Sequence, residues 1–218
     1  MSTNLDQTTG LSAFDEWKLF LDEVLYPQGG SPPEGKWPVQ GEWSAEEYLA
    51  VTDHTNRLVE FTDGFLELLP MPTDRHQAIL LYLSIVFERF IKPRGGKVRF
   101  SPLRLRIGPR RFREPDLLLL RSAGDPRGEN RFWTGADLTL EVVSDDKPER
   151  DLDQKRGDYA EAGVPEYWIV DPQTETISVL TLQGDQYAEA GVYRRGDRSP
   201  SILLAGFSVD VTAVFDAD

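Results

Sequence analysis

The spacing of apolar and polar positions divides the chain into two parts. From Ser12, apolar side chains recur at helical spacing, and Ser12 is a suitable N-cap. These apolar residues are Phe14, Trp17, Leu21 and Val24. The Pro- and Gly-rich stretch 26–38 that follows favours a linker. We therefore expect residues 1–40 to form an N-terminal extension and residues 41–218 to form the main domain.

The first half of the main domain alternates between helical and strand patterns. Ser44 and Glu47 have the spacing of a capping box at a helix start. Alternating residues on both sides of Asp63-Gly64 predict a β-hairpin. A long helix is expected over residues 74–91. Its apolar stripe consists of Ile79, Leu80, Leu83, Val86, Phe87 and Phe90.

The second half reads mainly as strands. The segments predicted as strands are 97–101, 103–107, 115–120, 137–143 and 166–171. Two of them, 115–120 and 137–143, are apolar enough to lie in the centre of a sheet that is covered on both faces. A helix is expected over 150–163, closed by Gly163, and antiparallel strands from 176 onward. This order predicts an α/β fold with one mixed sheet flanked by helices.

Composition narrows the class of protein. Of the 218 residues, 39% are apolar and 28% charged, as in soluble globular proteins. Cysteine is absent from the sequence, which excludes disulfides, zinc–thiolate sites and thiol catalysis. Neither a membrane-length apolar run nor a signal peptide is visible, so we expect a cytoplasmic protein without a membrane partner.

The charge is unevenly distributed. The net charge of −13 argues against a protein that coats nucleic acid, because such binding depends on neutralising phosphates. Residues 103–114 nevertheless contain five arginines and one acid. Local charge of this sign could steer a nucleic acid, and the candidate contacts are Arg104, Arg106, Arg111 and Arg113. The alternative is a pair of edge strands with solvated arginines.

Two acids lie in segments that should be buried. Asp116 opens the strand 115–120, and Glu141 lies inside the strand 137–143. Carboxylates brought together on neighbouring buried strands repel unless one is protonated or a cation lies between them. Mg²⁺ and Mn²⁺ accept oxygen ligands of this kind, so a bound divalent ion would offset the repulsion between the two buried carboxylates.

The next helix adds a cation. Asp151, Lys155 and Tyr159 follow one another at intervals of four residues and so share one helix face. Lys155 could contact a phosphate or orient a water beside the metal. The alternative is an ordinary Asp–Lys pair on the helix surface, which stabilises a helix by only a few tenths of a kcal/mol.

These segments resemble a known family. "EPDLLLL", "LTLEVVSDD" and "RDLDQKRGDYAEAGVPEYWIVDP", together with the upstream "RLVEFTDGFLELLPMPTDRHQAILLYL", are similar to the Uma family of restriction-endonuclease-like proteins in the PD-(D/E)XK nuclease superfamily. The resemblance covers residues 43–185, in the right order and at compatible spacing. It implies a restriction-endonuclease-like core with a mixed β-sheet flanked by helices, and Mg²⁺ or Mn²⁺ as the cofactor.

The resemblance also assigns roles. Asp116 and Glu141 match the two acids that hold the metal, and Glu60 matches an upstream glutamate that adds a direct or outer ligand. In the short superfamily motif a lysine lies two residues after the second acid. That position is Val143 here, and the family's helical lysine corresponds to Lys155.

Two further residues match as supporting groups. Tyr159 lies one helical turn after the lysine, and His76 opens the long helix, where it could form a hydrogen bond near the site. The competing interpretation of His76 is a helix N-terminal residue with a structural partner.

The resemblance implies an endonuclease that hydrolyses phosphodiester bonds of DNA, with Asp116, Glu141 and Lys155 as catalytic residues. A homodimer is expected by analogy, since two nicks on opposite strands need two sites. The main alternative is an inactive protein of this fold that binds nucleic acid or a protein partner. A glycosidase-type pair of carboxylates is a second alternative, and it requires an aromatic-lined cleft.

Overall fold

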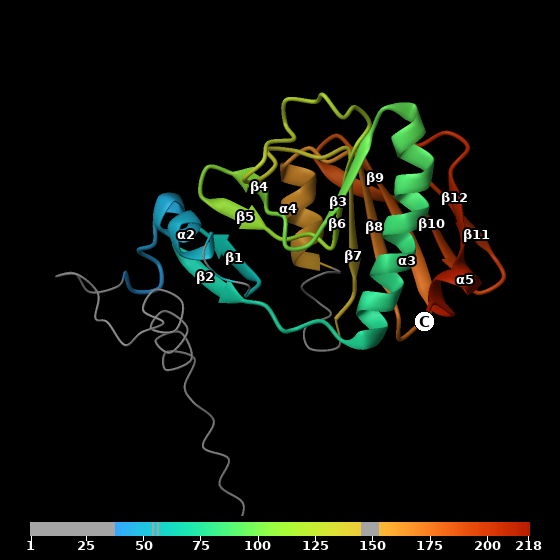
Figure 1. Cartoon of the computed structure of the whole chain (residues 1–218), viewed down its shortest axis with the longest axis horizontal. Helices are drawn as coiled ribbons and strands as arrows, with labels where there is room; N and C mark the ends of the chain where they lie inside the picture. Colours follow the sequence, from blue (N-terminus) through green and yellow to red (C-terminus); the bar gives the residue numbers. More distant parts are fainter. Residues whose placement is uncertain (1–37, 54, 56, 145–152) are drawn as a thin grey trace, which may run out of the picture.

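The computed structural model describes residues 38–53, 55, 57–144 and 153–218. Its centre is a six-stranded sheet of order β10-β9-β8-β7-β6-β3 (Figure 1). The strands are β3 (Lys97–Phe100), β6 (Leu117–Leu120), β7 (Leu138–Val142), β8 (Glu166–Asp171), β9 (Thr176–Gln183) and β10 (Gln186–Arg194). Only β7 and β8 pair in parallel within this sheet. The expected mixed α/β fold with a central mixed sheet is confirmed.

A second, four-stranded antiparallel sheet lies beside the central one and was not expected as a separate unit. Its strands, in spatial order, are β2 (Phe65–Leu68), β1 (Val59–Thr62), β5 (Arg111–Arg113) and β4 (Leu105–Gly108). The predicted hairpin turn is confirmed, because Asp63 and Gly64 have φ values of 48° and 100°. A Cβ atom on Gly64 would lie 2.3 Å from the carbonyl oxygen of Gly41, so this position accepts only glycine.

The remaining elements frame the two sheets. The helices are α2 (Ala45–Thr52), α3 (Asp74–Ile91), the 3₁₀ turn η1 (Lys92–Arg94), α4 (Lys155–Glu161) and α5 (Val211–Phe215), and the short strands β11 (Arg198–Pro200) and β12 (Ser208–Asp210) form a third sheet. The capping box of Ser44 and Glu47 is present as predicted. None of the helices in the described ranges is long and apolar enough to cross a membrane. The expected helix of the N-terminal extension lies outside the described residues.

Helices cover both faces of the central sheet. Alternate residues of β6 divide between two clusters of buried side chains, as expected for a strand whose side chains point to opposite faces. Leu117 and Leu119 pack in the cluster that contains α3, whereas Leu118 and Leu120 pack in the cluster that contains α4. The prediction that this strand is covered on both faces is confirmed.

Candidate active site

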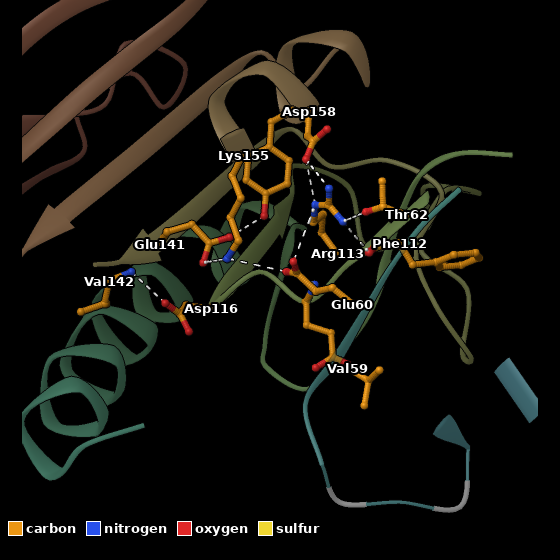
Figure 2. Close-up of polar contacts among 12 residues, drawn as sticks. Val59, Glu60, Thr62, Phe112, Arg113, Asp116, Glu141, Val142, Lys155 and Asp158 are labelled. Carbon is orange, nitrogen blue, oxygen red and sulfur yellow. Dashed lines mark hydrogen bonds and ion pairs between the residues drawn. The ribbon is translucent and has the colours of Figure 1, made fainter. Parts of the chain in front are cut away.

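Asp116 and Glu141 lie at the same end of the two central strands. Leu117 pairs with Leu140 across β6 and β7, so Asp116, which precedes β6, and Glu141, which follows Leu140, lie at the same end of this antiparallel pair. The backbone N–H of Val142 donates a hydrogen bond to Oδ2 of Asp116 at 2.7 Å (Figure 2). The register therefore brings together the two acids that the sequence singled out.

Both carboxylates line the same cleft, but they are held from different sides. Val143, two residues after Glu141, belongs to the cluster on the α4 side, and side chains two residues apart on a strand share a face. Glu141 therefore lies on the α4 side, where its partners Lys155 and Tyr159 are found. Asp116 precedes β6, and its carboxylate contacts the ring of His76 at the start of α3.

Lys155 is the first residue of α4 and reaches Glu141 from the neighbouring element. Its side chain is 3% exposed, and its Nζ lies 2.8 Å from Oε2 of Glu141. Glu60 lies on the other side of the ammonium group, with 3.7 Å between Nζ and Oε1. A lysine on a helix thus occupies the place beside the second acid that Val143 cannot fill. The expected Asp151 neighbour lies outside the described residues.

Tyr159 holds the other oxygen of Glu141. Its hydroxyl donates a short hydrogen bond to Oε1 of that carboxylate. Burial, and then the negative charge of Glu141, raise the pKa of Tyr159 well above its usual value. The phenol therefore remains a neutral donor, and together with Lys155 it fixes the orientation of the glutamate.

A buried ion-pair network of Glu60, Arg113 and Asp158 lies next to Lys155. Arg113 is 2% exposed. Its Nη2 lies 2.6 Å from Oδ2 of Asp158, and its Nε lies 3.7 Å from Oε2 of Glu60. Burial alone would lower the pKa of Arg113, but the charges of Glu60 and Asp158 outweigh it and the pKa is raised. Glu60 is therefore held between two cations, Lys155 and Arg113.

His76 supports Asp116 from the start of α3. Its backbone N–H is bonded to the capping side chain of Thr73, which sets the first turn of the helix. Its ring Nε2 lies 3.1 Å from Oδ2 of Asp116. The prediction of a histidine that forms a hydrogen bond near the site fits this geometry, because the ring contacts the carboxylate of Asp116.

Glu114 is a buried acid of this site to which sequence reasoning gave no role. It is 5% exposed, and burial, followed by the charge of Glu60, raises its pKa to about 8. Its Oε2 finds no hydrogen-bond partner among the described residues. The sequence signal for a role of Glu114 is its position immediately before Pro115 and Asp116, at the entry of a buried strand.

The acids open onto a cleft of about 530 Å³. Its polar floor contains Glu114, Asp116, Glu141, Lys155 and His76. The opposite wall is apolar and is formed largely by the chain between β2 and α3. Catalytic candidates from four parts of the sequence therefore meet in one concave site.

The expected three-carboxylate metal set is not formed. Within the described ranges no group of three His, Cys, Asp or Glu side chains is arranged to hold a metal, because Glu60 faces Lys155 and Arg113 instead of the cleft. Asp116 and Glu141 still fit Mg²⁺ or Mn²⁺, which are commonly held by one or two carboxylates with water and substrate oxygens. Because burial raises the pKa of Glu114 to about 8, this third acid is mostly protonated at neutral pH and adds little negative charge to the site.

Two of the four arginines predicted to contact nucleic acid, Arg104 and Arg113, are buried in ion pairs, and this burial removes them from the surface that a nucleic acid could reach. Arg104 places Nη2 2.6 Å from Oδ1 of Asp53, and Arg113 pairs with Asp158. Arg111 pairs with Glu161, while Arg106 is exposed and donates to the carbonyl of Gly108. Much of the positive charge of residues 103–114 is therefore neutralised by acidic side chains of the protein itself.

A central mixed sheet with helices on both faces makes this an α/β protein, and an aspartate, a glutamate and a lysine line one cleft, as the sequence resemblance implied. The model of the Uma2 family, described as "Putative restriction endonuclease", matches residues 45–212. Since this match covers most of the sequence, the chain belongs to the Uma2 family.

A solved structure has the same fold. It is described as a putative nuclease belonging to DUF820 from Anabaena variabilis ATCC 29413, and it superposes with a TM-score of 0.64 at 21% sequence identity. The superposition covers 77% of this chain and 96% of that chain. No curated protein matches the sequence.

Proposed function

We propose that this protein is a metal-dependent endonuclease that hydrolyses phosphodiester bonds of DNA. The observation that carries the proposal is the meeting of Asp116, Glu141 and Lys155 inside one cleft. Membership of a family described as restriction endonucleases supports the reaction class.

Each residue has a distinct role in the proposed reaction. Asp116 and Glu141 would hold Mg²⁺ or Mn²⁺, which when bound supplies positive charge to the phosphate and makes water more acidic. Lys155 lies against Glu141 and presents its charge to negative charge that develops on the phosphoryl group. Tyr159 and His76 keep the two carboxylates in place.

Plasmid cleavage tests the proposal. Purified protein is incubated with plasmid and Mg²⁺ or Mn²⁺, beside the Asp116→Ala and Glu141→Ala variants. We expect nicked and linear products from the unaltered protein and none from the variants. Cleavage that survives both substitutions would come from a contaminant or from another site.

The alternatives make different predictions. An inactive protein of this fold would bind no divalent ion at Asp116 and Glu141, which calorimetric titration with Mn²⁺ measures directly. A glycosidase-type pair needs an aromatic-lined cleft, but the described residues that line this one include no Phe, Tyr or Trp. A homodimer that cuts both strands stays a prediction, to be tested by light scattering.

A further inference from the structure

The cleft has two chemically different halves. The acids and Lys155 form one side, and the other side is a wall of aliphatic side chains. This wall consists of Leu58, Leu69, Pro70, Met71 and Pro72. Met71 is 66% exposed, on the segment that joins β2 to α3 below the end of β7 (Figure 1). A large exposed apolar side chain at the mouth of a charged site favours a ligand that has one apolar part and one charged part.

The cations around the cleft are already engaged. Among the described lining residues, the lysine and arginine side chains are Lys155 and Arg75. Lys155 pairs with Glu141, and Arg75 pairs with Glu175 at 3.2 Å. A protein that grips a duplex does so by neutralising several backbone phosphates. This cleft offers few cations for that purpose, so contacts with the apolar wall must supply much of the binding free energy.

The size of the cleft sets a second limit. A volume of about 530 Å³ is that of a pocket for one small molecule rather than for a double helix. Inside a duplex the faces of the bases are covered by their neighbours in the stack. An apolar wall in a cleft can cover the face of a base only after that base has left the stack.

We infer that the cleft takes an unstacked nucleotide, whose base lies against the aliphatic wall and whose phosphate lies toward Asp116 and Glu141. The orientation of the phosphate rests on the proposed function. Two sources supply this chemistry: single-stranded nucleic acid, and a nucleotide extruded from a duplex. Both leave the base free to enter while the phosphate reaches the polar floor.

Binding measured without cleavage tests this inference separately from the nuclease. Fluorescence anisotropy with Ca²⁺ in place of Mg²⁺ compares three DNA probes: a single strand, a blunt duplex, and the same duplex with one bulged nucleotide. We expect the single strand and the bulged duplex to bind at least about tenfold more tightly than the blunt duplex. With about two phosphates neutralised, log K should fall with log salt at a slope of about −1.4 for the single strand.

Substitutions at the wall locate the contact. Met71→Glu places a negative charge on the wall and should weaken single-strand binding about tenfold, whereas Met71→Leu should bind like the unaltered protein. Ile202→Glu is the matched control, because Ile202 is 58% exposed and does not line the cleft. Thermal melting of each variant verifies that its fold is kept.

The outcomes separate the two proposals. Tighter binding of the blunt duplex with a steep salt slope, or a Met71→Glu variant that binds as well as the Ile202→Glu control, overturns the inference. Plasmid cleavage could still be present in that case, and the nuclease would stand. Preferential single-strand binding that depends on Met71 but is never followed by cleavage in Mg²⁺ or Mn²⁺ supports the inference and removes the nuclease.

Discussion

Asp116 and Glu141 line one cleft at the same end of β6 and β7, and the backbone N–H of Val142, next to Glu141, donates a hydrogen bond to the carboxylate of Asp116. Each acid has its own donors: His76 serves Asp116, while Lys155 and Tyr159 serve Glu141. The two carboxylates are therefore oriented independently, which allows their roles to be tested one residue at a time.

Conservative removal of either carboxylate should abolish metal binding. Asp116→Asn and Glu141→Gln keep the size of the side chains but remove the charges that attract the ion. We expect the affinity for Mn²⁺ to fall by more than about 100-fold, beyond the loss typical of an outer-shell partner. Calorimetric titration measures it. Asp185→Asn, on an exposed residue next to the β9–β10 turn, is the control and should bind like the unaltered protein. Unchanged affinity in both site variants would contradict the assignment.

Lys155 should be important for stability as well as for function. Lys155→Met leaves Glu141 and Glu60 buried near an apolar side chain, and breaking a buried pair in this way costs about 3–5 kcal/mol. Urea denaturation measures the loss. A double-mutant cycle with Glu141→Gln provides the control, because the paired substitution should cost less than the sum of the two single ones. Strict additivity would mean that the two side chains do not interact.

His76 should act on the metal through Asp116. His76→Ala removes the hydrogen bond to Oδ2, and we expect Mn²⁺ affinity to fall by about 10- to 100-fold while the protein stays folded. The bond between the backbone of residue 76 and Thr73 survives this change, so α3 keeps its N-cap. His76→Gln retains a donor and should restore part of the affinity. If alanine and glutamine behave alike, the ring does not orient the carboxylate.

The meeting of Asp116 and Glu141 in one cleft could be anticipated from local pattern. Two apolar strands with an acid at the entry of one and inside the other already indicate central strands that carry acids. The resemblance to the Uma family placed Lys155 on the helix, and the structure brings it to Glu141. The long helix over residues 74–91 also followed from periodicity.

The burial of Arg104 and Arg113 in ion pairs could not be predicted from local sequence pattern. The acid that binds Arg104 lies 51 residues away, and the acid that binds Arg113 lies 45 residues away. An arginine on a short strand looks the same in sequence whether it faces solvent or a buried carboxylate. The burial of Glu114 could not be predicted either, because it depends on the second sheet. The division of the strands into two sheets is set by tertiary packing and not by local sequence.

Glu166 provides a test of whether burial of an acid alone marks a site. It lies on β8 and is as buried as Glu141, but hydrogen-bond donors surround both of its oxygens. Ser201 and Trp168 donate to Oε1 at 2.6 and 2.7 Å, and the backbone N–H groups of Ile202 and Leu203 donate to Oε2 at 2.8 and 2.7 Å. These bonds tie the segment after β11 to the central sheet.

Glu166→Gln should therefore destabilise the fold and leave the chemistry intact. The amide turns a donor toward other donors and weakens charge-assisted bonds, at a cost on the order of 3 kcal/mol. The urea midpoint should fall, whereas Mn²⁺ affinity and plasmid cleavage below the melting temperature should match the unaltered protein. Glu141→Gln should instead abolish Mn²⁺ binding. A folded Glu166→Gln protein without metal affinity would show that the two glutamates are coupled, and that donor saturation does not separate a structural acid from a functional one.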